Sequence, residues 1–146
     1  MKKLPLIFLL LFGLSLPLGA RNAFALDGKW VGYITQNPSP LDTIYQFELD
    51  LQTDGERIFG HTMIAFTSRP EYYGVIRFEG LVSGNTLVFD ELELMDQLML
   101  EYAYWCLKRI SLVANFYGDR AILSGSWTSD ECSFSTGEVY LERMMS

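Results

Sequence analysis

Carboxylates are the most densely placed chemistry-bearing side chains in this sequence. Asp90, Glu91 and Glu93 lie within four residues, and Asp96 and Glu101 follow shortly after them. On an extended strand Glu91 and Glu93 share a face, and paired carboxylates can bind calcium or hydrolyse glycosides. Glycoside hydrolysis, however, needs one carboxylate with a raised pKa opposite another across a cleft. Neighbours on one strand face do not meet that need, so we expect a solvated acidic face and no metal site.

His61 is the only histidine. A general base would need a nucleophile or an orienting carboxylate beside it, and we expect His61 to point outward from a strand next to Gly60. The sequence has no Gly-x-Ser-x-Gly elbow, no phosphate-binding glycine loop and no zinc-ligand spacing. We therefore expect no catalytic residues and no cofactor, and we do not expect an enzyme.

Cys106 and Cys132 are the only cysteines. An even number of cysteines in an exported chain indicates a disulfide bond, which in the chain-entropy model stabilises a loop of this length by roughly 3 to 4 kcal/mol. The alternatives are a metal pair or a catalytic thiol. Neither has the histidine cluster or Cys-x-x-Cys spacing that would support it.

Aromatic side chains are the most useful functional signal. Residues 26–146 contain 18 of them: 3 Trp, 8 Tyr and 7 Phe. Most are expected to fill a core, but a subset lies at the rims of the expected strands. Tyrosine and tryptophan combine apolar area with a polar group, which suits a sugar, lipid or peptide ligand. We assign this candidate ligand site to Tyr72, Tyr73, Tyr102, Tyr104 and Trp105.

The first 25 residues have the organisation of a signal peptide. Lys2 and Lys3 form a basic start, residues 6–18 are apolar, and Ala23-Phe24-Ala25 is a small-x-small cleavage site. We expect cleavage near Ala25 and export to the periplasm or the extracellular space. Residues 26–146 then form one domain without a transmembrane segment.

The charge of the exported part restricts its partners. Residues 26–146 carry eight basic and eighteen acidic side chains, a net charge of −10. Such a balance argues against nucleic acid and anionic lipid surfaces. A small ligand or an extracellular protein remains as the expected partner.

Residues 26–146 contain eight segments with strand character. The clearest is 44–52, where Tyr45, Phe47, Leu49 and Leu51 alternate with polar residues, as in a strand with one buried face. The other expected strands are 28–35, 57–67, 72–81, 86–94, 105–114, 121–128 and 138–144.

Short glycine turns connect several of these strands, including Asp54-Gly55 and Gly84-Asn85. Residues 95–103 contain good helix formers and no turn residues, which favours a short helix or an irregular lid; one long bent strand is the alternative. Eight sequential strands indicate an all-β fold, a single antiparallel up-and-down β-barrel, with a β-sandwich as the alternative.

Gly28-Lys29-Trp30 in the first expected strand, with Arg143 in the last, resembles the structural signature of the lipocalin and avidin-like (calycin) barrels. In that signature a basic side chain from the end of the barrel lies against the tryptophan, where a guanidinium can stack on the indole. The resemblance implies structural roles for Gly28, Trp30 and Arg143. We expect the same of Trp127, which follows a second Gly-x-Trp. Val31-Gly32-Tyr33 lacks the polar groups expected of a biotin site.

The order of motifs is also similar to that of an uncharacterised family of small secreted bacterial β-barrel proteins. This resemblance covers most of residues 26–146 and implies secretion and a barrel, but no activity. It is carried by Gly28-Lys29-Trp30-Val31-Gly32, Cys106-Leu107-Lys108, Leu123-Ser124-Gly125-Ser126-Trp127, Cys132 and residues 137–143.

These observations together favour a binding module for a small apolar or amphipathic molecule. It would enter at a mouth between residues 38–40 and 95–101. Glycines at 32, 60, 74 and 125 are expected to leave space, with a filled lower half and a shallow pocket near Tyr72, Tyr104 and Trp105. The alternative is a protein-interaction module such as an inhibitor of a secreted hydrolase, since exported barrels with a similar first strand include inhibitors of extracellular proteases and lysozymes.

The cysteine assignment is tested by counting free thiols in the mature protein, unfolded without reductant. We expect none, because both sulfurs are in the Cys106–Cys132 bond. Two reactive thiols would show that the bond does not form.

Overall fold

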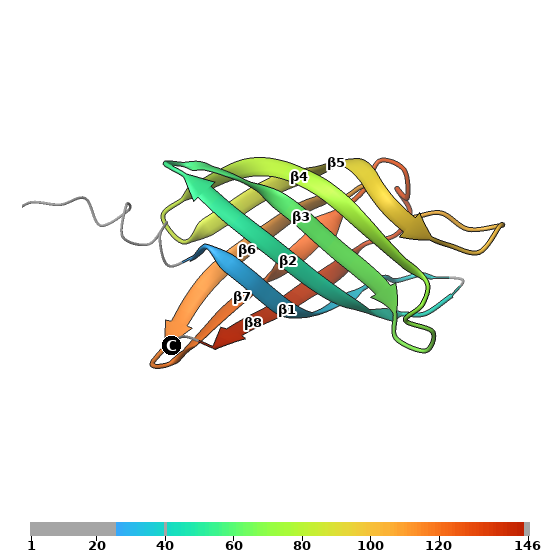
Figure 1. Cartoon of the computed structure of the whole chain (residues 1–146), viewed down its shortest axis with the longest axis horizontal. Coiled ribbons are helices and arrows are strands. Elements are labelled where there is room, and N and C mark those ends of the chain that lie inside the picture. Colours follow the sequence, from blue (N-terminus) through green and yellow to red (C-terminus); the bar gives the residue numbers. More distant parts are fainter. Residues whose placement is uncertain (1–25, 40, 145–146) are drawn as a thin grey trace, which may run out of the picture.

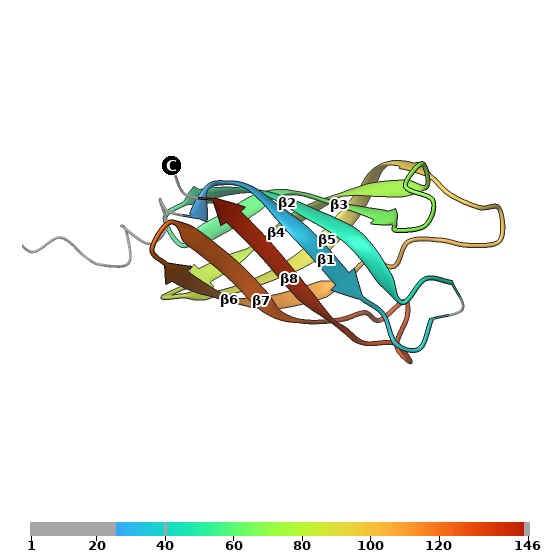
Figure 2. The same cartoon turned by 90° about the horizontal axis from the view of Figure 1, so that it is seen from below.

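Eight antiparallel strands form a closed barrel (Figures 1 and 2). The computed structural model describes residues 26–39 and 41–144, so the expected signal peptide lies outside the described residues. The last strand pairs with the first, which closes the barrel and excludes the sandwich alternative. The strands are β1 (Gly28–Thr35), β2 (Ile44–Asp54), β3 (Arg57–Phe66), β4 (Tyr73–Ser83), β5 (Thr86–Leu98), β6 (Arg109–Tyr117), β7 (Arg120–Thr128) and β8 (Gly137–Met144).

Alternation along β2 places its apolar side chains inside the barrel. Tyr45, Phe47, Leu49 and Leu51 are all buried, whereas the residues between them face outward or are only partly covered. Each such side chain stabilises the fold by about 1.5 to 3 kcal/mol when fully buried. The period-two pattern therefore sets which face of the strand points to the core.

The two ends of the barrel have different connections (Figure 1). At one end, β2–β3, β4–β5 and β6–β7 are joined by two-residue turns. Each turn begins with a glycine of positive φ, 63° at Gly55, 62° at Gly84 and 60° at Gly118, as in a type II′ turn. We call this the closed end. The other, open end has the four longer connections, residues 36–43, 67–72, 99–108 and 129–136.

Trp30 seals the interior near the closed end. Its side chain is fully buried, and its Nε1 donates a hydrogen bond of 2.9 Å to the Leu26 carbonyl. The Arg143 guanidinium lies 4.4 Å from the ring centroid and donates to the Asp27 carbonyl. Burial lowers the pKa of Arg143, and the Asp27 carboxylate offsets part of that effect. The arrangement is the one that the calycin resemblance implies.

Residues 95–103 form no helix, so that part of the expectation is wrong, whereas residues 99–103 are irregular, as the other part predicted. β5 continues through Leu98 because its outer half pairs with β4, from Tyr73↔Leu98 to Val75↔Asp96. Pairing along β4 outweighs the helix propensity of these residues. An irregular segment, residues 99–108, follows, and β6 begins at Arg109 instead of Trp105. Residues 27–39 and 41–144 contain no helix.

Glycines 32, 60, 74 and 125 do not leave space for a ligand, contrary to expectation. A Cβ on Gly60 would lie 1.9 Å from the Asp50 carbonyl oxygen of the neighbouring strand β2, and φ at Gly60 is +149°. A Cβ on Gly74 would lie 2.8 Å from the Trp105 ring. Gly32 and Gly125 likewise sit against carbonyl oxygens of neighbouring strands. The glycines thus allow close approach of strands and of one indole ring.

Trp30→Ala tests the seal at the closed end. We expect a loss of about 3 to 5 kcal/mol in the free energy of unfolding, because a fully buried indole leaves a cavity. Urea unfolding measures it. Tyr117→Ala, at an exposed ring, is the control and should change stability by about 0.5 kcal/mol or less. A loss under about 1 kcal/mol for Trp30→Ala would contradict the role of this side chain.

Candidate functional site

A cavity of about 550 Å³ lies at the open end of the barrel. Its walls come from the ends of β1, β2, β3 and β7 and from three long connections, residues 36–43, 99–108 and 129–136. Aromatic rings supply much of the lining, namely Tyr45, Tyr102, Tyr104, Trp105, Trp127 and Phe134. The half nearer the closed end is filled by packed side chains such as Phe78 and Phe89, whose ring centroids are 4.5 Å apart.

The polar groups of the three buried rings are bonded within the protein. Trp105 Nε1 donates to the Tyr73 carbonyl at 3.0 Å, and Trp127 Nε1 donates to the Thr35 carbonyl at 2.7 Å. The Tyr45 hydroxyl lies 3.2 Å from Ser39 Oγ. Burial raises the pKa of Tyr45, so its phenol is neutral. These rings therefore offer a ligand apolar faces and few polar groups.

Trp105 closes the cavity on its β3–β4 side. Its ring centroid lies 5.4 Å from that of Phe66 and 6.1 Å from that of Tyr45. The absence of a side chain at Gly74 lets the indole lie against β4. Trp105 is thus inside the barrel mouth although it belongs to no strand.

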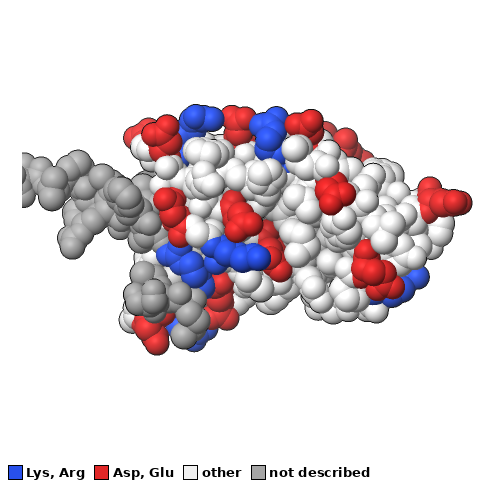
Figure 3. Space-filling view, viewed as in Figure 1, with Lys and Arg blue, Asp and Glu red and all other residues white. Residues whose placement is uncertain are grey.

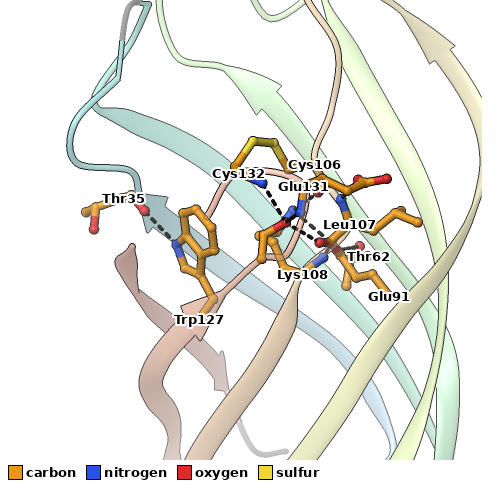
Figure 4. A network of polar contacts seen from close by, with 10 residues as sticks. Thr35, Thr62, Glu91, Cys106, Leu107, Lys108, Trp127, Glu131 and Cys132 are labelled. Carbon is orange, nitrogen blue, oxygen red and sulfur yellow. Dashed lines mark hydrogen bonds and ion pairs between the residues drawn. A yellow bond between two sulfur atoms is a disulfide. The ribbon is translucent and has the colours of Figure 1, made fainter. Parts of the chain in front are cut away.

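Lys108 and Glu91 form a buried ion pair at the cavity (Figure 4). Lys108 Nζ lies 2.8 Å from Glu91 Oε1, and the two side chains are 4% and 0% exposed. The backbone N–H of Lys108 also donates to Glu91 Oε1 at 3.0 Å, and the Thr62 hydroxyl donates to Oε2. Lys108 Nζ in turn donates to the Cys106 carbonyl at 3.1 Å and lies 6.0 Å from the Trp127 ring centroid. Each charge is thereby compensated by the other and by hydrogen bonds to protein groups.

The expectation that Glu91 and Glu93 share a solvated face is wrong. In the pairing of β4 with β5, Phe78 lies opposite Glu91, and its neighbour Arg77 lies opposite Glu93. Leu92 therefore has no partner on β4 and is the extra residue of a β-bulge. A bulge reverses the alternation of side chains beyond it. Glu91 therefore keeps the inward phase of Phe89, while Glu93 is outside with Arg77 at 3.3 Å.

The other candidate acids lie outside the barrel or at its rim. Asp90 pairs with Arg109 at 3.5 Å, Asp96 accepts a bond from the Tyr73 hydroxyl at 2.8 Å, and Glu101 is exposed. His61 is also exposed. Within residues 26–39 and 41–144, no three His, Cys, Asp or Glu side chains are grouped to hold a metal ion.

A disulfide bond joins two of the cavity walls, as the cysteine count predicts. Cys106 of the segment 99–108 is bonded to Cys132 of the segment 129–136. Glu131 Oε1 accepts from the Leu107 N–H at 2.7 Å, and Ser129 Oγ donates to the Leu107 carbonyl at 2.6 Å (Figure 4). These bonds fix two long connections to one another beside Lys108.

The five predicted ligand-site residues are divided by the structure. Tyr102, Tyr104 and Trp105 line the cavity. Tyr72 instead packs against Phe66 with ring centroids 6.0 Å apart, and the Tyr73 hydroxyl bonds to Asp96. Ser39 and Met99, from the two segments predicted to border the mouth, also line the cavity. Lining residues that the sequence analysis did not assign include Ile34, Leu41, Lys108 and Phe134.

Charged side chains of both signs are interspersed on the face of the barrel shown in Figure 3, and no continuous basic patch lies there. Over the described ranges, no helix has the length and apolar character needed to cross a membrane.

A scan against models of known protein families, a search of curated proteins and a search of solved structures each found no match. What the cavity does is therefore inferred from its geometry and chemistry.

The buried pair is tested by Glu91→Leu. We expect a loss of about 3 to 5 kcal/mol in the free energy of unfolding, because the Lys108 charge would remain buried without a counterion. Adding Lys108→Met should recover most of that loss. Glu142→Leu, beside the half-exposed Arg120, is the control and should cost about 1 kcal/mol or less. Equal effects of Glu91→Leu and Glu142→Leu would refute the buried pair.

Proposed function

We propose that this protein is a binding module whose barrel holds one small apolar or amphipathic molecule at its open end. The observation that carries the proposal is a cavity of about 550 Å³ walled by aromatic faces above a filled core. Cavities of roughly 300 to 1,000 Å³, mostly apolar with a few polar groups, are typical of small-molecule sites. Lys108 is such a polar group.

The proposed place of action is outside the cytoplasm. A disulfide bond is consistent with an oxidising compartment, and the sequence pattern of residues 1–25 supports export. The contact between Trp30 and Arg143 is consistent with a calycin-like barrel. Membership of the family of small secreted bacterial β-barrel proteins is proposed on the order of motifs from Gly28 to Arg143.

Exposed apolar side chains at the open end favour a second candidate function. Tyr102 and Phe134 are 77% and 72% exposed, and Leu98 and Tyr104 are also exposed. Exposed aromatic groups on loops can act as anchors in a protein interface. The alternative is therefore a protein-interaction module, such as an inhibitor of a secreted hydrolase.

A ligand screen tests the first function against the second. Fatty acids, porphyrins and short glycans are offered to the mature protein, and binding is followed by tryptophan quenching and thermal shift. We expect at least one class to bind more tightly than about 1 mM, or roughly −4 kcal/mol. If none does, the small-molecule function fails and the protein-partner function replaces it.

Ala103→Trp tests whether such a ligand binds in the cavity. Ala103 lines the cavity within the segment 99–108, so an indole there should occupy ligand space and weaken binding by about ten-fold or more. Val113→Trp adds the same ring on the outer face of β6 and should leave the affinity unchanged. Equal affinities for the two variants would place the ligand elsewhere.

A further inference from the structure

We propose that the head group recognised in the cavity is a neutral oxygen acceptor, such as the carbonyl of a ketone or ester, bound by Lys108 Nζ and preferred over a carboxylate. The inference rests on the proposed function and names the ligand class of that same site.

The first step concerns the hydrogen bonds of Lys108. An ammonium group has three donors. Two are directed to Glu91 Oε1 and to the Cys106 carbonyl, at 2.8 and 3.1 Å. Among the described residues no oxygen acceptor is found for the third, and Nζ lies 6.0 Å from the centroid of the Trp127 ring, which lines the cavity together with Lys108. A ligand oxygen can therefore complete the coordination of Nζ, whereas a hydrocarbon cannot.

The second step concerns charge. Among the described residues that line the cavity, Lys108 is the only charged one, and its charge is already matched by Glu91. Glu91 cannot turn away without loss, because both its oxygens hold protein donors, from Lys108 and Thr62. A ligand carboxylate would thus add a second anion to one buried cation. A carbonyl oxygen accepts the free N–H without adding charge.

The third step concerns orientation. Lys108 lies beside the Trp127 ring, while Tyr104 and Phe134 line the cavity and are exposed at its rim. A ligand with its oxygen at Nζ would place its hydrocarbon part along these rings toward the mouth. The expected class is accordingly a ketone or ester with one apolar chain.

Three matched probes test the inference: 2-octanone, octanoate and octane, measured at neutral pH by tryptophan quenching. In the wild-type protein we expect 2-octanone to bind at least about ten-fold more tightly than octanoate. Lys108→Met should lower the affinity for 2-octanone by about ten-fold and leave the affinity for octane nearly unchanged, because only the ketone loses a hydrogen bond.

Glu91→Gln gives the sharpest outcome. The amide keeps the shape of the side chain but leaves the Lys108 charge uncompensated, so octanoate should gain at least about ten-fold in affinity and overtake 2-octanone. Glu142→Gln, on the outer surface, should leave the three affinities as they are. If Lys108→Met or Glu91→Gln does not fold, Glu91→Leu with Lys108→Met removes both charges together with the Nζ donor. This double variant should weaken the binding of 2-octanone by about ten-fold and leave the binding of octane nearly unchanged, and equal effects on the two probes would overturn the inference.

Different failures overturn different statements. If octanoate binds the wild-type protein as tightly as 2-octanone, charge compensation does not select the ligand and the inference is wrong. If Lys108→Met weakens octane and 2-octanone equally, Lys108 acts by packing alone, which also overturns it. In both cases the proposed binding function stands. If none of the three probes binds and the wider screen is also negative, the proposed function itself fails.

Discussion

Closure of the sheet is the constraint on which the rest of the structure depends. Pairing of β1 with β8 leaves no open edge between the first and last strands and limits the interior of an eight-stranded barrel. Because consecutive strands alternate in direction, every second connection falls at the same end. Three tight turns therefore share one end, and the four long segments share the other. The cavity lies where the long segments meet, since short turns leave little chain to build a wall.

Most of the fold follows from local patterns in the sequence. The alternation from Tyr45 to Leu51 identifies a half-buried strand even when its neighbouring strands are unknown. Gly55 and Gly84 likewise identify tight turns. Six of the eight expected strands lie within two residues of those observed at both ends. The exceptions are β5 and β6. Good helix formers from Met95 to Leu98 remain in a strand because β4 pairs with them, and a single-residue propensity contains no information about that partner.

The candidate site was less accessible to prediction, because its key residues depend on register. In the strand alternation Glu91 lies two residues after the buried Phe89, and Lys108 lies two residues before the buried Ile110. Extending the alternation of both strands would therefore have placed these two opposite charges inside the barrel. Because Glu91 belongs to the acidic run from Asp90 to Glu93, its sequence context predicts a solvated position instead of a buried one. The bulge at Leu92 then separates Glu91 from Glu93, and nothing in the local composition marks that position. Trp105 is predictable as a rim aromatic, but its place inside the mouth depends on the missing side chain of Gly74.

The contact between Arg143 and the Asp27 carbonyl brings the first and last strands together at the closed end. The chain therefore starts and ends its course around the barrel at almost the same place. A short linker from the end of β8 to the start of β1 would make the backbone cyclic. Opening such a ring at a tight turn, for instance at Gly84-Asn85, would give a circular permutant with an unchanged order of neighbours around the wall. The disulfide and the four long segments would all be retained, so the architecture of the mouth is independent of where the polypeptide is cut at the opposite end.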